Sequence, residues 1–316
     1  METSGKSSQQ LKKTMCLSEK SERDVLDCLL VYDLVCNLMH VNNTGVYFRT
    51  KSVIFYDSRL QLTNDFTNFQ DLHEVSLEML NFDDNVLASH SANNYKQSDS
   101  FLIPKPFIFD SSDFKETSMI VSTLVEFKAE WAKPFDSSLS DQYMLRQRGT
   151  FFFTDIKRLN ASVLELSYVG DFKMLIIQPH EGVTLKHVTT QLALNDLEEI
   201  YNELHSDGLK EIDVGLKKFS LTSSLIFNKA FKSMGVIDVF SPDDADLSLD
   251  NDLYIMNFEQ RVTVTVSETG TTATAYTPAN VAKFTGQNNI TFSKSFIFLI
   301  VHGPSLTILF CGKYGE

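Results

Sequence analysis

The stretch from Arg261 to Phe310 constrains the fold more than any other part of the sequence. Valine alternates with threonine over 262–266, which is the period-2 pattern of a half-buried strand. A polar run of mostly Thr, Ala, Asn and Gly follows over 271–291, and an apolar strand pattern resumes over 292–301. A structureless loop of about 20 residues is uncommon inside a compact domain and is usually functional. This loop is therefore the first candidate for a functional element.

The rest of the chain mixes helices and strands without a regular β-α-β repeat. Apolar residues at helical spacing predict helices over 8–39, 64–80, 188–204 and 225–234, with a short helix and a loop over 84–113. Apolar and β-branched runs predict strands over 46–55, 118–131, 149–153, 161–168, 172–177 and 212–219. Because several of these strands are joined by short turns, the predicted class is α+β with mixed sheets.

The composition excludes some classes of partner. The net charge of −13 argues against nucleic-acid binding, since phosphate neutralisation needs a basic face. No apolar run approaches the roughly 18 residues of a membrane span. The first eight residues are polar and lack the apolar stretch of a secretory signal. We therefore expect no nucleic acid and no membrane as partners, and nothing in this sequence that directs export.

Enzymatic chemistry has no support in the motifs. None of the seven histidines lies in a metal-binding pair, and Cys16, Cys28, Cys36 and Cys311 fit no zinc spacing. The aspartates over 243–252 lack the glycine and terminal glutamate of a calcium loop, which favours a solvated acidic turn. There is no nucleophile elbow and no phosphate-binding loop. The prediction is a protein that is not an enzyme, with no catalytic residue, no metal and no cofactor.

Several motifs resemble those of the serpin family of serine protease inhibitors. Residues 127–135 resemble its breach segment around Trp131, and Val-Thr-Val-Ser-Glu-Thr-Gly-Thr over 264–271 resembles the hinge before its reactive-centre loop. Further matches are the segments 231–240 and 245–248 and the two closing strands at 292–300 and 308–313. The resemblance covers most of the chain from about residue 6 onward. It implies one serpin-like domain over 1–316, with mixed β-sheets surrounded by helices and an exposed reactive-centre loop at about 269–291.

The resemblance also implies a suicide-substrate mechanism. A target serine protease cuts the loop and is held as an acyl-enzyme, while the loop inserts as a new strand into the main sheet. Such a strand needs small side chains on its buried face, and Thr271, Ala273, Ala275 and Thr277 share one face at strand period. Gly270 suits a hinge whose backbone angles must change. The sequence thus permits insertion.

The expected cleavage site follows from the loop length. Counted between the hinge residue Glu268 and Phe292, the resemblance places the reactive bond at Phe284-Thr285. Phe284 suits the hydrophobic primary pocket of a chymotrypsin-like protease. A shift of one residue would move the bond to Lys283-Phe284 and make the specificity trypsin-like. We expect a chymotrypsin-like target before a trypsin-like one, a monomer, and an extracellular location by resemblance, with a cytoplasmic one as the alternative.

The sequence also departs from the family pattern. Its match begins at the entry to the family's fourth helix, so we expect an N-terminally truncated domain without the first three helices. In the shutter region, Thr123 stands where the family has Asn, and Gln260 where it has His. Pro278 falls late in the inserted strand, where a missing N–H breaks a ladder. These departures keep open a non-inhibitory serpin with a binding, storage or chaperone role, or a defective truncated paralogue.

Overall fold

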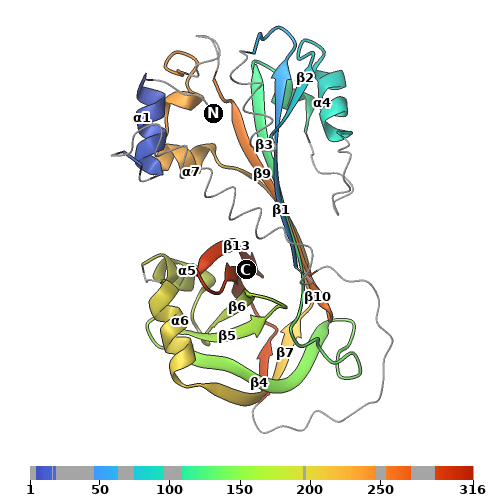
Figure 1. Ribbon diagram of the computed structural model, residues 1–316, viewed down its shortest axis with the longest axis vertical. Coiled ribbons are helices and arrows are strands. Elements are labelled where there is room, and N and C mark those ends of the chain that lie inside the picture. The colour runs from blue at the N-terminus through green and yellow to red at the C-terminus, as the bar shows by residue number, and fades with distance from the viewer. Residues whose placement is uncertain are drawn as a thin grey trace. The chain divides into compact units, whose positions relative to one another are not determined.

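The computed structural model describes residues 5–15, 17–18, 46–62, 75–95, 109–194, 197–246, 254–271 and 289–315 (Figure 1). The chain divides into two compact units. The first is built around 48–126 and 222–263, and the second around 127–221 and 264–316. The strands β3 and β9 of the main sheet contribute residues to both units.

The main sheet has six strands in the order β2-β1-β3-β10-β9-β8. Its strands are β1 (Val46–Asp57), β2 (Val75–Leu80), β3 (Met119–Glu130), β8 (Phe219–Ile226), β9 (Asn257–Val266) and β10 (Gly270–Thr271). β1 and β2 are parallel, and so are β3 and β9. The short β10 is antiparallel to both of its neighbours, β3 and β9. The sheet is therefore mixed.

A second sheet has seven strands in the order β11-β7-β4-β5-β6-β12-β13. These are β4 (Met144–Ile156), β5 (Ala161–Ser167), β6 (Phe172–Pro179), β7 (Leu209–Lys217), β11 (Asn289–Phe292), β12 (Phe296–His302) and β13 (Thr307–Tyr314). All neighbouring pairs are antiparallel except β11 with β7. The glycine in the Val169-Gly170-Asp171 turn has φ 77°, which suits the tight connection from β5 to β6.

The helices of the described residues are short. They are α1 (Gly5–Thr14), α4 (Asn85–Asn93), α5 (Leu185–Leu194), α6 (Leu197–Ser206) and α7 (Asn228–Ser233), with 3-10 turns at Ser111–Phe114 and Asp238–Phe240. α4 begins where the carboxylate of Asp84 accepts the N–H of Leu87 at 3.0 Å. α6 buries Ile200 and Leu204, which are four residues apart and so share one face.

Each unit has its own core. In the second unit, β5, β6 and β12 pack against α5 and α6 through buried residues that include Val163, Leu175, Ile177, Val188, Ile200, Leu204, Ile297 and Val301. In the first unit, Phe55 meets Tyr95 and Phe109 edge to face at 5.9 and 5.6 Å. Each unit is compact because it buries an apolar cluster of its own.

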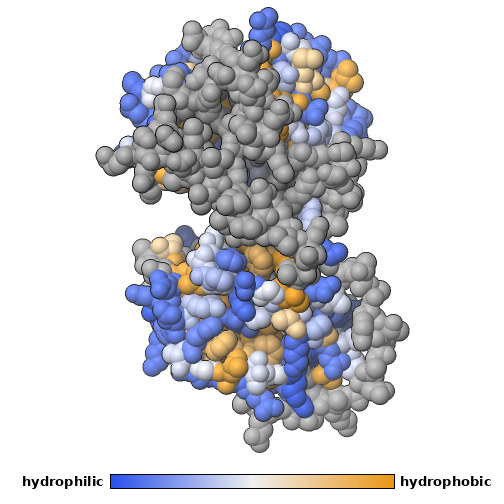
Figure 2. Space-filling model, in the orientation of Figure 1, coloured by the Kyte–Doolittle hydropathy of each residue, from blue (hydrophilic) through white to orange (hydrophobic). Residues whose placement is uncertain are grey.

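Apolar side chains also reach the surface. Figure 2 shows hydrophobic residues scattered among hydrophilic ones on the visible face. In the first unit, β8 exposes Leu225 and Ile226, and the region of α7 exposes Met234 and Ile237. Apolar atoms make up more than half of an ordinary protein surface, so these residues alone do not define an interface. In the described part of the chain, no helix is long and apolar enough to cross a membrane.

The predicted α+β class with mixed sheets is confirmed, whereas three local predictions are wrong. Residues 75–80 form the strand β2, because they pair in parallel with β1; the rest of the predicted helix over 64–80, residues 64–74, lies outside the described residues. The single helix over 188–204 is two helices, α5 and α6. The helix over 225–234 is shorter, because its first two residues belong to β8. Most of the helix over 8–39 lies outside the described residues.

Candidate functional site

The candidate site lies at the start of the predicted loop, where β10 enters the main sheet. Gly270 pairs with Glu130 of β3, and Thr271 pairs with Ala129 of β3 and with Val266 of β9. A Cβ built on Gly270 would lie 2.0 Å from the carbonyl oxygen of Ala129. Only glycine allows two backbones to approach this closely. β10 is thus a two-residue strand between the ends of β3 and β9.

The side chain of Thr271 is buried and contacts a tyrosine. It is 0% exposed, and its Oγ1 lies 2.8 Å from the hydroxyl of Tyr168. Tyr168 is 1% exposed. Burial raises the pKa of the Tyr168 phenol, and the hydrogen bond with Thr271 opposes this effect only in part. The phenol is therefore neutral, and the threonine is its hydrogen-bond partner.

Aromatic rings hold Tyr168 in position. The indole of Trp131 stacks on the phenol ring with centroids 4.3 Å apart and planes 7° from parallel. Phe127 meets the same ring edge to face at 5.3 Å, and Phe135 meets Trp131 edge to face at 5.8 Å. Because such rings have few rotamers once packed, they fix the point at which the tyrosine hydroxyl meets the loop.

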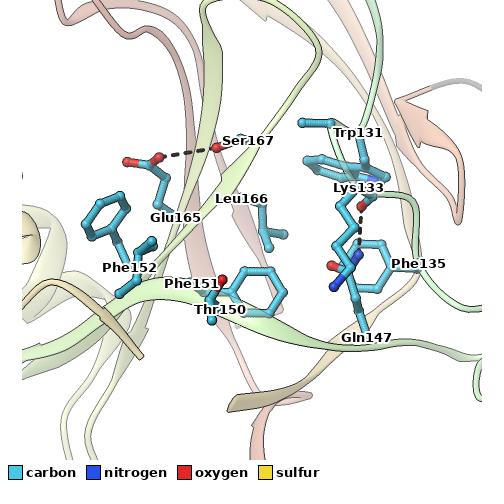
Figure 3. Close-up of a pocket in the computed structure, with 12 residues that line it drawn as sticks. Trp131, Lys133, Phe135, Gln147, Thr150, Phe151, Phe152, Glu165, Leu166 and Ser167 are labelled. Carbon is cyan, nitrogen blue, oxygen red and sulfur yellow. Dashed lines mark hydrogen bonds between the residues drawn. The ribbon is translucent and has the colours of Figure 1, made fainter. Parts of the chain in front are cut away.

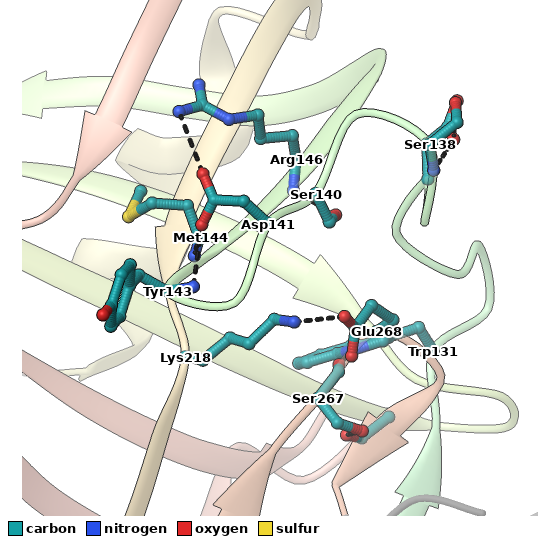
Figure 4. Close-up of polar contacts among 12 residues, drawn as sticks. Trp131, Ser138, Ser140, Asp141, Tyr143, Met144, Arg146, Lys218, Ser267 and Glu268 are labelled. Carbon is teal, nitrogen blue, oxygen red and sulfur yellow. Dashed lines mark hydrogen bonds and ion pairs between the residues drawn. The ribbon is translucent and has the colours of Figure 1, made fainter. Parts of the chain in front are cut away.

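Residues 131–135 bind the backbone just before Gly270 (Figure 4). The indole Nε1 of Trp131 donates to the carbonyl oxygen of Ser267 at 2.9 Å. The backbone N–H of Trp131 donates to the carbonyl of Thr269, and that of Phe135 donates to the carbonyl of Glu268, both at 2.9 Å. Three consecutive carbonyls of the hinge segment, defined here as 267–271, are thus held by one neighbouring segment.

An ion pair adds a contact to the hinge segment. Nζ of Lys218 contacts Oε1 of Glu268, and the two side chains are 25% and 31% exposed. A pair this accessible contributes at most about 1 kcal/mol, so its main effect is to position the glutamate. The N–H of Lys218 donates to the carbonyl of Tyr143, next to a turn in which Asp141 accepts the N–H groups of Tyr143 and Met144 at 2.7 and 2.8 Å (Figure 4). These bonds lower the pKa of Asp141.

The chain that follows the predicted loop is anchored in the second sheet. β11 pairs in parallel with β7, placing Asn289 opposite Asp213 and Phe292 opposite Leu216. Phe292 is fully buried. Asp213 is also buried and receives a two-pronged hydrogen bond from Arg148, whose Nε and Nη2 lie 2.7 and 3.0 Å from its oxygens. Residues 270–271 and 289–291 of the predicted 269–291 loop are therefore strand residues.

The structure brings together four of the residues singled out from the sequence. Trp131, Glu268, Gly270 and Thr271 meet at the hinge segment through the contacts above. The remaining predicted hinge residues and the predicted reactive bond, with its alternative, lie outside the described residues: Ala273, Ala275, Lys283, Phe284 and Thr285.

The two shutter residues lie in the first unit. Thr123 of β3 is directly opposite Gln260 of β9. Oγ1 of Thr123 lies 3.1 Å from Oγ of Ser52 in β1, which ties β1 to β3. Gln260 forms no hydrogen bond to any other residue that the structure describes through its side chain. Thr123 thus links β3 to β1 through Ser52, a partner that the sequence did not indicate.

Sequence reasoning missed two members of the site. Tyr168 was predicted only as the last residue of a strand, yet its partner Thr271 lies 103 positions away. Lys218 was predicted only as part of the strand over 212–219, yet it pairs with Glu268 50 positions later. A tyrosine at the end of an apolar strand needs a hydrogen-bond partner when buried, and this was the one available signal. Among the described residues, no group of three or more His, Cys, Asp or Glu could hold a metal ion.

Comparisons with known proteins agree on one family. The model of the family described as "Serpin (serine protease inhibitor)" matches residues 1–316. The chain is 24% identical over 305 residues to heparin cofactor 2 of Oryctolagus cuniculus, covering 91% of this chain and 62% of that one. It is 31% identical over 224 residues to the leukocyte elastase inhibitor of Homo sapiens, covering 63% of this chain and 59% of that one. The chain thus spans less than two thirds of the length of these relatives.

Solved structures show the same fold. Human glycosylated kallistatin has a TM-score of 0.81 at 24% identity, covering 99% of this chain and 86% of that one. A thyroxine-binding globulin in complex with thyroxine has a TM-score of 0.78 at 19% identity, covering 99% of this chain and 88% of that one. At these sequence identities, the similarity shows that the fold is shared.

Proposed function

Because the chain belongs to the serpin family, we propose that it inhibits a serine protease as a suicide substrate, through cleavage and insertion of its reactive-centre loop. The observation that carries the proposal is β10. Gly270 and Thr271 form strand pairs with β3, antiparallel to it, at the place where an inserting strand would start. The serpin domain over 1–316 and the loop at about 269–291 are part of this proposal.

The register of β10 defines a path for insertion. Continued one residue at a time, the pairing of Thr271 with Ala129 would place Ala273 opposite Phe127 and Ala275 opposite Val125. Directly opposed residues in neighbouring strands point to the same face of a sheet. Ala129, Phe127 and Val125 are all buried. The loop residues opposite them must therefore be small, as these two alanines are.

Insertion along this path has to replace an existing pairing. β3 and β9 are directly paired from Ile120 opposite Asn257 to Glu126 opposite Thr263. A new strand between them would pair with β3 on one side and with β9 on the other. Two sets of backbone hydrogen bonds would then replace one. In the same register Pro278 would lie opposite Ser122, and its missing N–H would leave a gap in the ladder there. The backbone hydrogen bonds of the proposed inserted strand are thus uninterrupted from residue 271 to residue 277.

The proposed reactive bond is Phe284-Thr285, and the proposed target is a chymotrypsin-like protease. The support is the loop count and the suitability of Phe284 for a hydrophobic primary pocket. The relationship to a leukocyte elastase inhibitor is consistent with a target outside the trypsin-like group. We also propose that the chain acts as a monomer without catalytic activity or a cofactor of its own, in the extracellular space.

A gel assay tests the inhibitory function. The protein is mixed with chymotrypsin or with trypsin and run under denaturing conditions, alongside the variants Phe284→Ala and Lys283→Ala. We expect a covalent complex with chymotrypsin that Phe284→Ala abolishes and Lys283→Ala retains. The opposite pattern with trypsin would move the bond by one residue. Cleavage within the loop without a complex for either protease would overturn the inhibitory function.

The second candidate is a non-inhibitory serpin with a binding, storage or chaperone role. Pro278 favours it, because an interrupted ladder weakens the inserted strand that traps a protease. The two candidates differ in their response to cleavage of the loop. A trapping serpin gains a strand and becomes more stable when cut, whereas a non-inserting one keeps the same melting temperature.

A further inference from the structure

A cavity of about 130 Å³ lies in the second unit, beside the segment that holds the hinge (Figure 3). Its walls come from 131–135, β4, β5 and the first residue of β7. The lining includes Trp131, Phe135, Gln147, Phe151, Phe152 and Leu166. The lining therefore contributes four aromatic rings, with Leu166 and Leu209 as aliphatic side chains in the wall.

One buried polar side chain faces this aromatic surface. Gln147 is 3% exposed, and its Nε2 donates to the carbonyls of Lys133 and Pro134, both at 2.8 Å. These two bonds fix the orientation of the amide. Its carbonyl oxygen Oε1 accepts no hydrogen bond within the part of the chain that the structure describes. This oxygen, on a side chain held in place by the two bonds, is available to a ligand that carries a donor.

The charged groups at the wall are already paired. The carboxylate of Glu165 lies 2.7 Å from Nε2 of His205 and 3.8 Å from Nζ of Lys173. Nζ of Lys133 donates to the carbonyl of Arg148 at 2.8 Å, so this ammonium group and the carboxylate of Glu165 place one charge of each sign in the wall. A ligand charge of either sign would lie near a like charge, so the cavity suits an uncharged molecule.

The volume of about 130 Å³ has room for one ring, since an apolar cavity of roughly 150 Å³ holds a benzene molecule. We propose that this cavity binds a small uncharged molecule with a single aromatic ring and one hydrogen-bond donor, of the phenol class. The ring packs among Trp131, Phe135 and Phe151, and the donor bonds to Oε1 of Gln147. This site is separate from the reactive-centre loop and from the path proposed for its insertion.

The cavity is linked to the hinge through its walls. Trp131 and Phe135 contact the cavity, and the same residues donate three hydrogen bonds to the carbonyls of residues 267–269. A ring that fills the cavity packs behind these donors and holds them in the arrangement of the uncleaved protein. Binding slows entry of the loop into the sheet; this effect on the loop rests on the proposed function, whereas binding itself does not.

Fluorescence tests the binding directly, because Trp131 is the only tryptophan in the chain. The uncleaved chain of 316 residues is titrated with phenol, and with benzene as the same ring without a donor, while indole emission is excited selectively. We expect a saturable change with both and about 10-fold weaker binding of benzene, as expected for one lost hydrogen bond. Gln147→Leu should remove the preference for phenol.

A matched pair of variants provides the control. Thr150 lines the cavity and is exposed, so Thr150→Phe should block the cavity and abolish the response to both probes. Thr190 is an equally exposed threonine on α5 that does not line the cavity, and Thr190→Phe should leave the response unchanged. If Thr150→Phe does not fold, Leu209→Phe at the rim is the second blocking variant, and it keeps Trp131 as the single reporter. An absent or unsaturable response in the folded wild-type chain, or a response that the cavity variants leave intact, would overturn the proposal. No protease is used, so failure here is distinct from failure of the inhibitory function.

Discussion

Replacing Thr271 with valine should destabilise the uncleaved protein through Tyr168. Valine keeps the branched shape of threonine but removes the hydroxyl that lies 2.8 Å from the Tyr168 phenol. Because Tyr168 is 1% exposed, its hydroxyl would then be buried without a hydrogen bond. An unsatisfied buried polar group costs about 1–3 kcal/mol, and we expect Thr271→Val to lower the free energy of unfolding by this amount.

A second variant makes the prediction specific to the bond. Tyr168→Phe removes the other hydroxyl and should cost about 0.5–1.5 kcal/mol, the net value of one hydrogen bond. In the double variant both partners are apolar, so its stability should be close to that of Tyr168→Phe alone. The two substitutions should therefore be non-additive by about 1–3 kcal/mol, within the range of residues in direct contact.

The assay is urea-induced unfolding of the uncleaved protein, followed by circular dichroism, for the wild type, the two single variants and the double variant. Thr265→Val serves as the matched control, because Thr265 bonds to Ser220 at 2.8 Å and makes no hydrogen bond to Tyr168. A cycle between Thr265→Val and Tyr168→Phe should be additive. If the Thr271 cycle is additive as well, Thr271 does not contact Tyr168 before cleavage, and β10 is absent from the uncleaved sheet.

Three further predictions follow from the same contacts. Gly270→Val should displace β10 from the sheet, because its Cβ would lie 2.0 Å from a carbonyl oxygen, and hydrogen exchange at the hinge segment should then be faster. Pro278→Ala should extend insertion, so the loop-cleaved variant should melt above the cleaved wild type; an equal value would mean that the proline is no barrier. Asp57→Asn should make the free energy of unfolding, measured by urea titration at a series of pH values, depend less on pH in the acid range. Burial raises the pKa of Asp57, but hydrogen bonds and charge from Arg59 outweigh it and keep the pKa below its ordinary value of 3.8. The ionised form therefore stabilises the fold above that value, and this contribution is lost as the pH falls through the lower folded-state pKa.

The sequence predicted well those elements whose pattern is local. The alternation of valine and threonine over 262–266 and the apolar run over 119–127 were sufficient to predict β9 and β3. The elements that depend on distant partners were predicted less well. β2 is a strand because it pairs with β1, and its own pattern is also compatible with a helix.

The candidate site shows the same division. Gly270 and Thr271 could be selected because glycine and small residues have backbone and packing properties that do not depend on the partner. The partners themselves, Tyr168 and Lys218, could not be identified, since hydrogen bonds and ion pairs across 103 and 50 positions leave no periodic signal. The family resemblance and the local residue types indicated the hinge segment, and only the structure identified the residues that contact it.

The most direct test of the account is the melting temperature of the protein before and after cleavage within 272–288. The intact chain is cut with a catalytic amount of protease, and nicking is confirmed by mass. If the loop continues β10 between β3 and β9, the cleaved protein gains a central strand and should melt well above the intact one. An unchanged melting temperature after complete cleavage would contradict insertion, and with it the proposed trapping mechanism.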